Sequence, residues 1–347
     1  MPATIRDVAK ASGVHVSTVS RTFSSPHLVN QETRNRVLAV AENLGYRPNR
    51  AARALITGRT HNIGLIVADI ANPFFPPLIK AAESQARDRD YHVFVADTNE
   101  DSVTEEKLVQ ALAKQVDGVL LCSPRMSNDL IERVGRDVPV VVVNRLVESI
   151  PAVVMDVAQG ARTAIEHLAG LGHSDLALLG GPRGSWTNRE IRRSVIATAR
   201  AVGVNLTVLG PNQPTEIAGA AAVDAICRSN ATGILAYNDL MAIGVLEGLH
   251  NRGIRVPEEI SVVGVDDIAL SRLVRPKLTT VATPTAAAGR TAVDMLLAQR
   301  GEDRRTTAQV TLHTELVVRD STGPGPRATG VPASGTARGQ VASYAKE

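Results

Sequence analysis

The sequence predicts a small all-α domain at the N-terminus and a larger α/β body built on doubly wound parallel sheet. Three observations predict this division. The chain has 347 residues, which is too long for one compact domain. In the first 60 residues, apolar positions follow helical spacing and are bracketed by capping residues. From residue 61 onward, short apolar runs alternate with helical segments, as in α/β proteins.

The overall composition excludes several classes of protein. Hydrophobic residues make up 44% and charged residues 21% of the chain, a balance that excludes global disorder. No apolar run approaches the roughly 20 residues that span a bilayer, and Met1–Asp7 lacks the apolar core of a secretory signal. Cys122 and Cys227 are too few for a disulfide framework or a zinc cluster. We therefore expect a cytoplasmic, reduced protein with no membrane partner, no metal site and no cofactor.

The net charge of +3 is unevenly distributed along the chain. Residues 1–60 contain nine basic and three acidic side chains, a net charge of +6, which leaves −3 for residues 61–347. A small basic domain on a mildly acidic body favours a polyanionic partner for the basic part alone. A solvated basic surface without a partner is the alternative that charge by itself leaves open.

The first helix is predicted to begin after Thr4 and to end at Gly13. The residues from Thr4 to Asp7 form a capping box, in which the Thr4 side chain accepts from a backbone amide and Asp7 reaches back. Ile5 and Val8 follow at helical spacing. Gly13 breaks the helix because glycine tolerates a left-handed turn.

Two further helices are predicted in the N-terminal domain. The second covers Val16–Phe23 with Val19 on its inner face. Asn30 caps a third helix over about 31–43, which Gly45 ends. Three short helices with a glycine turn between the first two form a helix-turn-helix unit.

The other faces of the second helix carry small polar groups and one long cation, namely Ser17, Thr18, Ser20 and Arg21. Compact donors and acceptors near a helix N-terminus suit base edges in a DNA major groove, and an arginine suits guanine or phosphate. These residues favour DNA binding over a generic helical bundle, which is the alternative.

The stretch Pro48–Gly58 is rich in alanine and has good helix propensity. A helix of about two turns is not stable alone, because nucleation costs more than so few hydrogen bonds return. A short helix that forms only with a partner and a plain linker both fit this stretch.

Seven apolar runs in the body predict strands, most of them continuous, as expected for parallel strands covered on both faces. The predicted strands are Asn62–Ala68, Tyr91–Ala96, Gly118–Cys122, Val138–Asn144, Asp175–Gly180, Gly233–Tyr237 and Ser261–Asp266. Neither GxGxxG after the first strand nor GxxxxGK[ST] occurs, which disfavours dinucleotide and nucleoside-triphosphate sites. Residues 321–347 switch to Gly, Pro, Ser, Thr and Ala, so we expect a flexible tail there.

Polar and aromatic residues follow several predicted strands, at the sheet edge where open α/β sheets bind ligands. They include Asp69, Phe74, Phe75, Asn144, Trp186, Asn238 and Asp266. Aromatic faces combined with amide and carboxylate groups suit a polyhydroxylated ligand, because rings stack on its carbons and polar groups bind adjacent hydroxyls. The alternative role is helix capping, which weighs most for Asp239 and Asp267.

Four N-terminal motifs together resemble the signature of the LacI/GalR family of transcriptional repressors. They are Thr4–Lys10, Gly13-Val14, Ser17–Arg21 and Leu44–Asn49. The resemblance continues to about residue 320, and several long motifs occur in the family's order. It implies a helix-turn-helix DNA-binding domain over 1–47, a hinge helix and linker over 48–60, and a periplasmic-binding-protein-like domain for effector binding and dimerisation over 61–320.

The resemblance places the second helix in the major groove and implies that the hinge inserts a leucine into the minor groove. The implied DNA-binding residues are Thr4, His15, Val16, Ser17, Thr18, Ser20, Arg21, Asn30, Asn49, Arg50, Ala52, Arg53 and Leu55. His15 replaces the serine or threonine usual at the helix start, which leaves one cap or phosphate contact open. Two packed hinge helices imply a homodimer on a near-palindromic operator.

For the body, the resemblance implies two doubly wound parallel-sheet subdomains joined by three crossovers, with a small-molecule effector in the cleft. The N-subdomain covers about 61–158 and 284–312, and the C-subdomain covers about 159–283 and 313–320. The implied effector-binding residues are Asp69, Phe74, Phe75, Asn144, Trp186, Arg189, Ile191, Asn238 and Asp266.

Ile191 departs from the family, because it stands where other members carry an effector-binding arginine. Arg189 matches a neighbouring family arginine, and the sequence does not fix whether its side chain faces the cleft. A pocket with Ile191 in place of a cation is expected to prefer a less polar or uncharged ligand. No specific sugar follows from the resemblance.

Three classes of function compete. A dimeric DNA-binding repressor controlled by a small molecule fits both parts of the chain. A solute-binding protein for transport would need a signal peptide and no basic domain. An enzyme is disfavoured, because the histidines lack metal-ligand spacing, no nucleophile elbow occurs and Cys122 is expected to be an inert buried thiol. Residues 321–347 contain no leucine heptad, so we expect a dimer rather than a tetramer.

Overall fold

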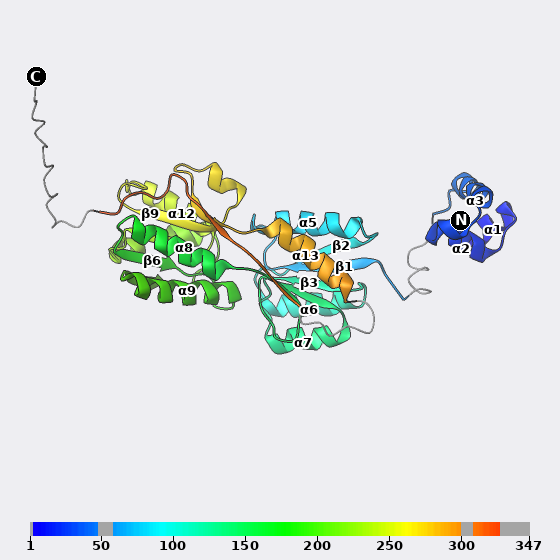
Figure 1. Ribbon diagram of the computed structural model, residues 1–347, viewed down its shortest axis with the longest axis horizontal. Helices are drawn as coiled ribbons and strands as arrows, with labels where there is room; N and C mark the ends of the chain where they lie inside the picture. The colour runs from blue at the N-terminus through cyan, green and yellow to red at the C-terminus, as the bar shows by residue number, and fades with distance from the viewer. Residues whose placement is uncertain (1–2, 48–57, 300–307, 327–347) are drawn as a thin grey trace, which may run out of the picture.

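A computed structural model describes residues 3–47, 58–299 and 308–326 of the chain. The described residues form a small helical domain and an α/β body with two six-stranded sheets, as predicted (Figure 1). Most of the predicted hinge lies outside them. Its expected DNA-binding residues Asn49, Arg50, Ala52, Arg53 and Leu55 therefore have no described structure.

The helical domain consists of α1 (Ile5–Ser12), α2 (Val16–Ser24) and α3 (Gln31–Asn43), which confirms the three predicted helices. A short 3₁₀ helix, η1 (Pro26–Leu28), was not predicted. The capping box of α1 is present, and Gly13 ends this helix in the left-handed region with φ 68°. The three helices pack through a small core of Val8, Ala9, Val19, Val37 and Ala41.

The first sheet of the body is entirely parallel, in the order β11-β5-β4-β3-β1-β2. Its strands are β1 (Asn62–Val67), β2 (His92–Asp97), β3 (Val119–Cys122), β4 (Val140–Val143), β5 (Ala152–Met155) and β11 (Gln309–Leu312). One face packs on α5 (Phe75–Arg87) and α13 (Thr285–Ala298). The other packs on α6 (Ser102–Ala113) and α7 (Asn128–Asp137). We call this unit the N-subdomain.

The second sheet has the order β12-β10-β9-β8-β6-β7, with only β12 antiparallel. Its strands are β6 (Asp175–Leu179), β7 (Asn205–Leu209), β8 (Gly233–Ala236), β9 (Ser261–Asp266), β10 (Thr279–Ala282) and β12 (Glu315–Val317). One face packs on α8 (Val157–Gly170) and α9 (Trp186–Val202). The other packs on α11 (Val223–Arg228) and α12 (Asp239–His250), with α10 (Glu216–Ala221) beside α12. We call this unit the C-subdomain.

All seven predicted strands are present, with ends that shift by no more than two residues. Sequence reasoning missed β5, β7, β10, β11 and β12. Both β7 and β11 lie at sheet edges, where exposed residues alternate with half-buried ones, so they lack a continuous apolar run. Two threonines in β10 are fully buried because their hydroxyls are hydrogen-bonded. Local composition therefore did not mark β7, β10 and β11 as strands, whereas β5 is a short, fully buried apolar run that sequence reasoning overlooked.

The chain passes between the two subdomains three times, after β5, after β10 and after β11 (Figure 1). Each passage follows a strand of one sheet and leads into an element of the other subdomain. The carboxyl ends of the parallel strands in both sheets therefore face the region between the subdomains. This topology places the loops after the strands at the cleft.

The expected flexible tail does not begin at Ser321. The Ser321 side chain is fully buried, donates to the Val262 carbonyl at 2.6 Å and accepts from the Thr279 amide at 2.8 Å. The Gly323 amide donates to Ser261 Oγ at 3.0 Å, and its carbonyl lies 3.1 Å from His173 Nε2. Residues 321–326 thus complete the C-subdomain, because their small side chains let the backbone approach the sheet closely. The rest of the tail lies outside the described residues.

A buried carboxylate, that of Asp239, joins α12 to the loop around η2 (Ala269–Arg272) and to β10. It is fully buried and accepts from the Ile268 amide at 2.9 Å, from Ser271 Oγ at 2.6 Å and from Thr280 Oγ1 at 2.5 Å. Burial raises the pKa of Asp239 to about 7, although the three donors oppose this increase. Helix α12 is capped by Asn238 rather than by Asp239, so the capping alternative for Asp239 was wrong.

The raised pKa of Asp239 predicts a pH dependence of stability. Folding raises this pKa above its ordinary value of 3.8, so the native state binds the proton more tightly than the unfolded chain. The resulting stabilisation is complete at low pH and is lost as the pH rises through about 7. Asp239→Asn cannot titrate, so the decrease in its urea midpoint between about pH 5.5 and about pH 8 should be smaller than in the wild type.

Asp129→Asn is the matched control, because Asp129 is exposed on α7. It should keep the wild-type pH dependence. The interpretation of Asp239 is contradicted if Asp239→Asn and the wild type lose stability equally over this pH range.

Candidate functional site

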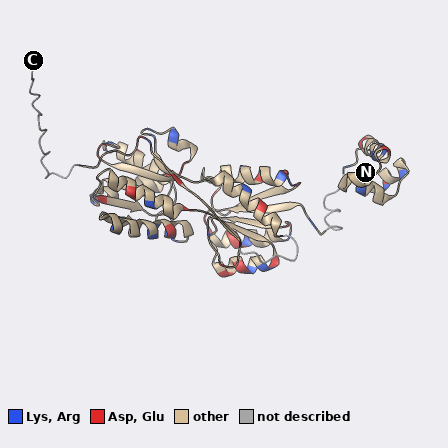
Figure 2. Cartoon of the chain, viewed as in Figure 1, with Lys and Arg blue, Asp and Glu red and all other residues tan. Residues whose placement is uncertain are grey.

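The helical domain exposes small polar side chains and one arginine of α2 on its outer surface. Ser17, Ser20 and Arg21 are exposed, whereas Val19 and Thr22 are buried against the other helices. Val16 and Thr18, which the sequence also predicts as DNA-binding, are half-buried. In Figure 2, ribbon segments of basic residues (blue) and of a few acidic residues (red) occur on this domain. The arrangement leaves small hydroxyls and one guanidinium exposed, where they can meet base edges or phosphates.

His15 replaces the usual cap residue of α2 and still performs the capping role. Its Nδ1 accepts from the Ser17 amide at 3.3 Å and lies 2.9 Å from Ser17 Oγ. Thr4 caps α1, and Asn30 caps α3 by accepting from the Glu32 amide at 2.9 Å. All three residues are exposed, so capping leaves part of each side chain accessible to a partner.

A cavity lies between the two subdomains, at the carboxyl ends of the strands. It encloses about 440 Å³ of atom-free space, part of it open to solvent. Five predicted effector-binding residues line it: Phe74, Phe75, Asn144, Asn238 and Asp266. The other lining residues are Asn72, Glu100, Ser123, Arg125, Val157, Thr187, Pro214, Tyr237, Val265 and Thr283.

Four predicted effector-binding residues do not line this cavity. Asp69 accepts from the Ala71 amide at 2.9 Å in the loop after β1. Trp186 is half-buried at the start of α9, and Arg189 is exposed on the same helix. Ile191 is fully buried in the core between α8 and α9. Ile191 therefore does not set the polarity of the cavity, and the ligand preference expected from it loses its basis.

Four lining residues have left-handed backbone conformations that non-glycine residues rarely adopt. The φ angles are 62° at Glu100, 52° at Ser123, 62° at Asn144 and 122° at Asp266. Each follows or ends a strand, namely β2, β3, β4 and β9. Such strain concentrates at functional sites, where the surrounding structure holds it in place. The cavity is therefore built from strand ends that turn sharply.

Asn144 links the two subdomains across the cavity. Its Nδ2 donates to Ser123 Oγ at 3.3 Å in the N-subdomain and to Thr187 Oγ1 at 3.0 Å in the C-subdomain. Its Oδ1 is buried and accepts no hydrogen bond from the described residues. A buried acceptor without a donor costs about 1–3 kcal/mol. Asn144 thus offers a ligand an acceptor that the protein leaves unused.

The C-subdomain side of the cavity combines a carboxyl group with an aromatic hydroxyl. Burial and the nearby Asp239 raise the pKa of Asp266 well above its ordinary value. Burial also raises the pKa of Tyr237, whose hydroxyl lies 3.0 Å from Ser185 Oγ. Asn238 uses both ends of its amide within the protein, accepting from the Met241 amide and donating to the Pro214 carbonyl.

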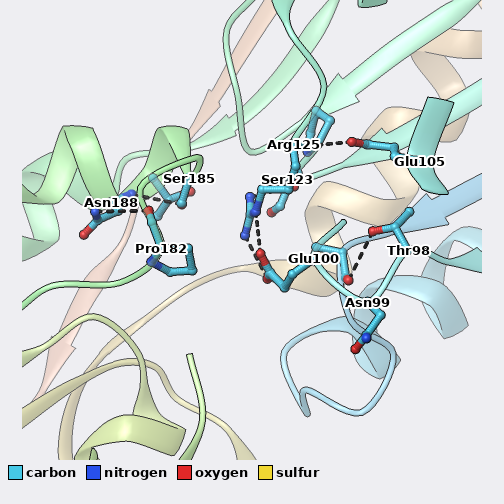
Figure 3. Close-up of polar contacts among 12 residues, drawn as sticks. Thr98, Asn99, Glu100, Glu105, Ser123, Arg125, Pro182, Ser185 and Asn188 are labelled. Carbon is cyan, nitrogen blue, oxygen red and sulfur yellow. Dashed lines mark hydrogen bonds and ion pairs between the residues drawn. The ribbon is translucent and has the colours of Figure 1, made fainter. Parts of the chain in front are cut away.

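Sequence reasoning missed an ion pair in the N-subdomain wall of the cavity. Arg125 binds Glu100 with two hydrogen bonds, from Nε to Oε2 at 2.5 Å and from the second terminal nitrogen to Oε1 at 2.9 Å (Figure 3). The Arg125 side chain is only 7% exposed. Arg125 follows β3 and Glu100 follows β2, so the rule that ligands bind beyond strand ends would have selected both.

Other reactive groups of the body have structural roles. Cys122 is buried, and burial strongly raises the pKa of its thiol, as expected for an unreactive cysteine. Asp267 pairs with Arg319 and with Arg272 rather than capping a helix. Across 3–47, 58–299 and 308–326, no group of His, Cys, Asp and Glu side chains is arranged to hold a metal ion. No helix in these ranges is long and apolar enough to cross a membrane.

Both parts of the chain match known families. Residues 4–49 match bacterial regulatory proteins of the lacI family, and residues 165–322 match a periplasmic binding protein-like domain. The chain is 33% identical over 339 residues to the HTH-type transcriptional regulator DegA of Bacillus subtilis (strain 168), covering 93% of this chain and 99% of that protein. It is 34% identical over 325 residues to the ribose operon repressor of Halalkalibacterium halodurans, covering 92% and 97%.

Solved structures show the same architecture. A lac repressor dimer bound to operator and the anti-inducer ONPF has a TM-score of 0.84 at 27% identity, covering 93% of this chain and 100% of that one. A LacI family regulator from Enterococcus faecalis V583 with bound ribose has a TM-score of 0.68 at 30% identity, covering 76% and 99%. The chain therefore belongs to the LacI family of bacterial regulatory proteins and is a DNA-binding transcriptional regulator rather than an enzyme.

Proposed function

We propose that this protein is a homodimeric repressor whose affinity for a near-palindromic operator is controlled by a small-molecule effector in the cleft between the subdomains. The observation that carries the proposal is the buried, unpaired Oδ1 of Asn144, which lines a cavity whose walls come from both subdomains. The relatives support the class of function, since one is named a ribose operon repressor. The protein acts in the cytoplasm, where its DNA lies.

Ligand binding in the cleft is coupled to DNA binding through the relative orientation of the two subdomains. A ligand that binds residues of both walls stabilises one relative orientation, because only there can all its contacts form. The N-subdomain follows directly on the hinge segment 48–60, so a change in its orientation changes the spacing of the two hinges in a dimer. Such coupling between sites is typically worth about 1–3 kcal/mol.

The DNA-binding surface consists of α2 and the hinge. Ser17 and Arg21 read bases or hold phosphates in the major groove, and Val16 offers an apolar contact to a thymine methyl. In the hinge, Leu55 inserts into the minor groove, while Arg50 and Arg53 neutralise phosphates. The exposed hydroxyl and guanidinium groups on the outer face of α2 support the roles in the major groove.

Arg21→Ala tests the DNA-binding surface. Loss of a base or phosphate contact by the exposed guanidinium should weaken operator binding by about 1–3 kcal/mol, or roughly 5–150-fold. Fluorescence anisotropy at fixed salt measures this, with an operator selected from random duplex DNA. Arg133→Ala, a change at an exposed arginine on α7, should leave the affinity unchanged. Equal operator affinity of Arg21→Ala and the wild type would refute the role of Arg21.

The cavity favours a polyhydroxylated effector. The unpaired Asn144 Oδ1 and the Asp266 carboxyl group both accept hydrogen bonds, which hydroxyl groups donate. Phe74 and Phe75 pack edge to face, with ring centroids 4.9 Å apart, and add apolar surface at the cavity wall. Relatives with bound ribose and with cellobiose are consistent with this class of ligand.

Asn144→Ala tests the effector site. A panel of sugars, polyols, nucleosides and purines is read by thermal shift and by Trp186 fluorescence, and hits are then tested for altered operator affinity. A ligand at about 100 times its dissociation constant adds about 2.7 kcal/mol of stability. That gain should vanish in Asn144→Ala and persist in Asn251→Ala, a change at an exposed residue. A ligand that stabilises Asn144→Ala as much as the wild type binds elsewhere.

Exposed apolar side chains support the homodimer. Phe94 on the edge strand β2 is 45% exposed. In the C-subdomain, Leu273 is 70% exposed just after η2, and Ile217 on α10 is 74% exposed. Large exposed apolar groups mark protein interfaces when they gather in patches, and an unpaired edge strand also invites pairing. The lac repressor relative is itself a dimer on its operator.

The double variant Phe94→Asp/Leu273→Asp tests the dimer. Two buried charges at an apolar interface should convert the dimer into a monomer at micromolar concentration, which light scattering measures as a halved mass. Val318→Asp, a change at a similarly exposed apolar residue, should remain dimeric. A wild-type mass equal to a monomer or a tetramer would contradict the proposed assembly.

A further inference from the structure

Arg125 is the cation of the cavity. It is the only basic side chain among the described residues that line this space, and its side chain is 7% exposed. Arg125 also lies close to Gly184 on the opposite wall, in the C-subdomain. A Cβ atom added to this glycine would be 3.7 Å from Arg125 Cδ. A ligand between the subdomains would therefore meet this guanidinium.

The protein already occupies three of the five N–H donors of Arg125, including the fork formed by Nε and one terminal nitrogen. Glu100 accepts from Nε and from one terminal nitrogen, which is the fork that binds phosphate and carboxylate groups in two-point contacts. The other terminal nitrogen donates to the Ser123 carbonyl at 2.8 Å. An anionic ligand could use the fork only by displacing Glu100.

Glu100 is held firmly in this position. Both Asn99 and Glu100 have left-handed φ angles, 50° and 62°, and the Glu100 amide donates to the Ala68 carbonyl at 2.6 Å. On the other side, Glu105 accepts from the Arg125 amide at 2.7 Å and thereby fixes the loop after β3 (Figure 3). The strained backbone at Glu100 and the Glu105 contact that fixes the loop of Arg125 distinguish this pair from an incidental surface ion pair.

The charges of the cavity therefore disfavour anions. Glu100 cancels the charge of Arg125, and Asp266 adds a third ionisable group, a carboxyl, to the lining. A phosphate or carboxylate entering the cavity would meet no unpaired cation, because Glu100 already neutralises Arg125, so its charge would be poorly compensated in a site of low dielectric constant. Uncharged hydroxyl groups can instead donate to Asn144 Oδ1 and Asp266.

We propose that Glu100 determines effector specificity: by occupying the guanidinium fork of Arg125, it restricts the cavity to uncharged polyhydroxylated ligands and excludes phosphorylated and carboxylated ones. The inference rests on the proposed role of the cavity as the effector site. Glu100 thus acts on the ligand through Arg125. The proposal predicts that removal of the Glu100 charge creates an anion-binding site that the wild type lacks. If the ion pair had only a structural role, no such site would form.

The test uses inorganic phosphate as the probe, at constant ionic strength against chloride, with thermal shift and calorimetry as readouts. Phosphate should not stabilise the wild type beyond the chloride control. In Glu100→Gln, the freed guanidinium should bind phosphate at least tenfold more tightly than the wild type does. Glu100→Gln/Arg125→Gln should lose that gain. Glu83→Gln is the matched control, because it breaks the exposed Glu83–Arg87 pair on α5 and should gain nothing.

Two results would overturn the proposal. One is phosphate binding by the wild type that Arg125→Gln abolishes, because Arg125 would then be available to anions with Glu100 in place. The other is a folded Glu100→Gln protein with no gain in phosphate affinity. If Glu100→Gln does not fold, the same phosphate-binding measurement is made on Glu100→Ala. Operator binding is measured separately, so failure of the repressor function is distinguishable from failure of the specificity proposal.

Discussion

The burial of parallel strands on both faces is the constraint on which the rest of this structure depends. In β3, β4, β5 and β8, every residue is buried, so these strands leave no room for polar side chains along their length. Polar groups can gather only where the strands end. Because the strands of each sheet run parallel, those ends meet at one edge, and three chain passages bring the two edges together. The cavity is the direct result.

Sharp turns at the strand ends convert this edge into a binding site. Left-handed residues at Ser123, Asn144 and Asp266 interrupt the strand direction just where the side chains begin to face the cavity. The contact from Asn144 to Thr187 joins the subdomains directly, so a ligand that uses Asn144 acts on both. The same geometry that creates the site therefore also supplies a route by which ligand binding alters the orientation of the subdomains.

The helical domain has a small core and is organised largely by the ends of its helices. Its core contains five buried side chains, so much of its organisation comes from helix ends fixed by local hydrogen bonds. Thr4, His15 and Asn30 each cap one helix. His15 is informative, because an unusual residue for the family keeps the capping contact through its ring nitrogen. The outer face of α2 is thus left free for a partner.

The sequence alone was sufficient for features with a local cause: the caps and glycine ends of the helices, the fully buried strands other than β5, and the family motifs. It placed five cavity residues correctly because strand ends share one edge. Tertiary packing decided the rest. The inward face of α9 depends on its contact with α8, which buries Ile191 in the core, while Arg125 from the other subdomain supplies the cation. Polar edge strands and residues 321–326 acquire order only from long-range hydrogen bonds, which no local pattern records.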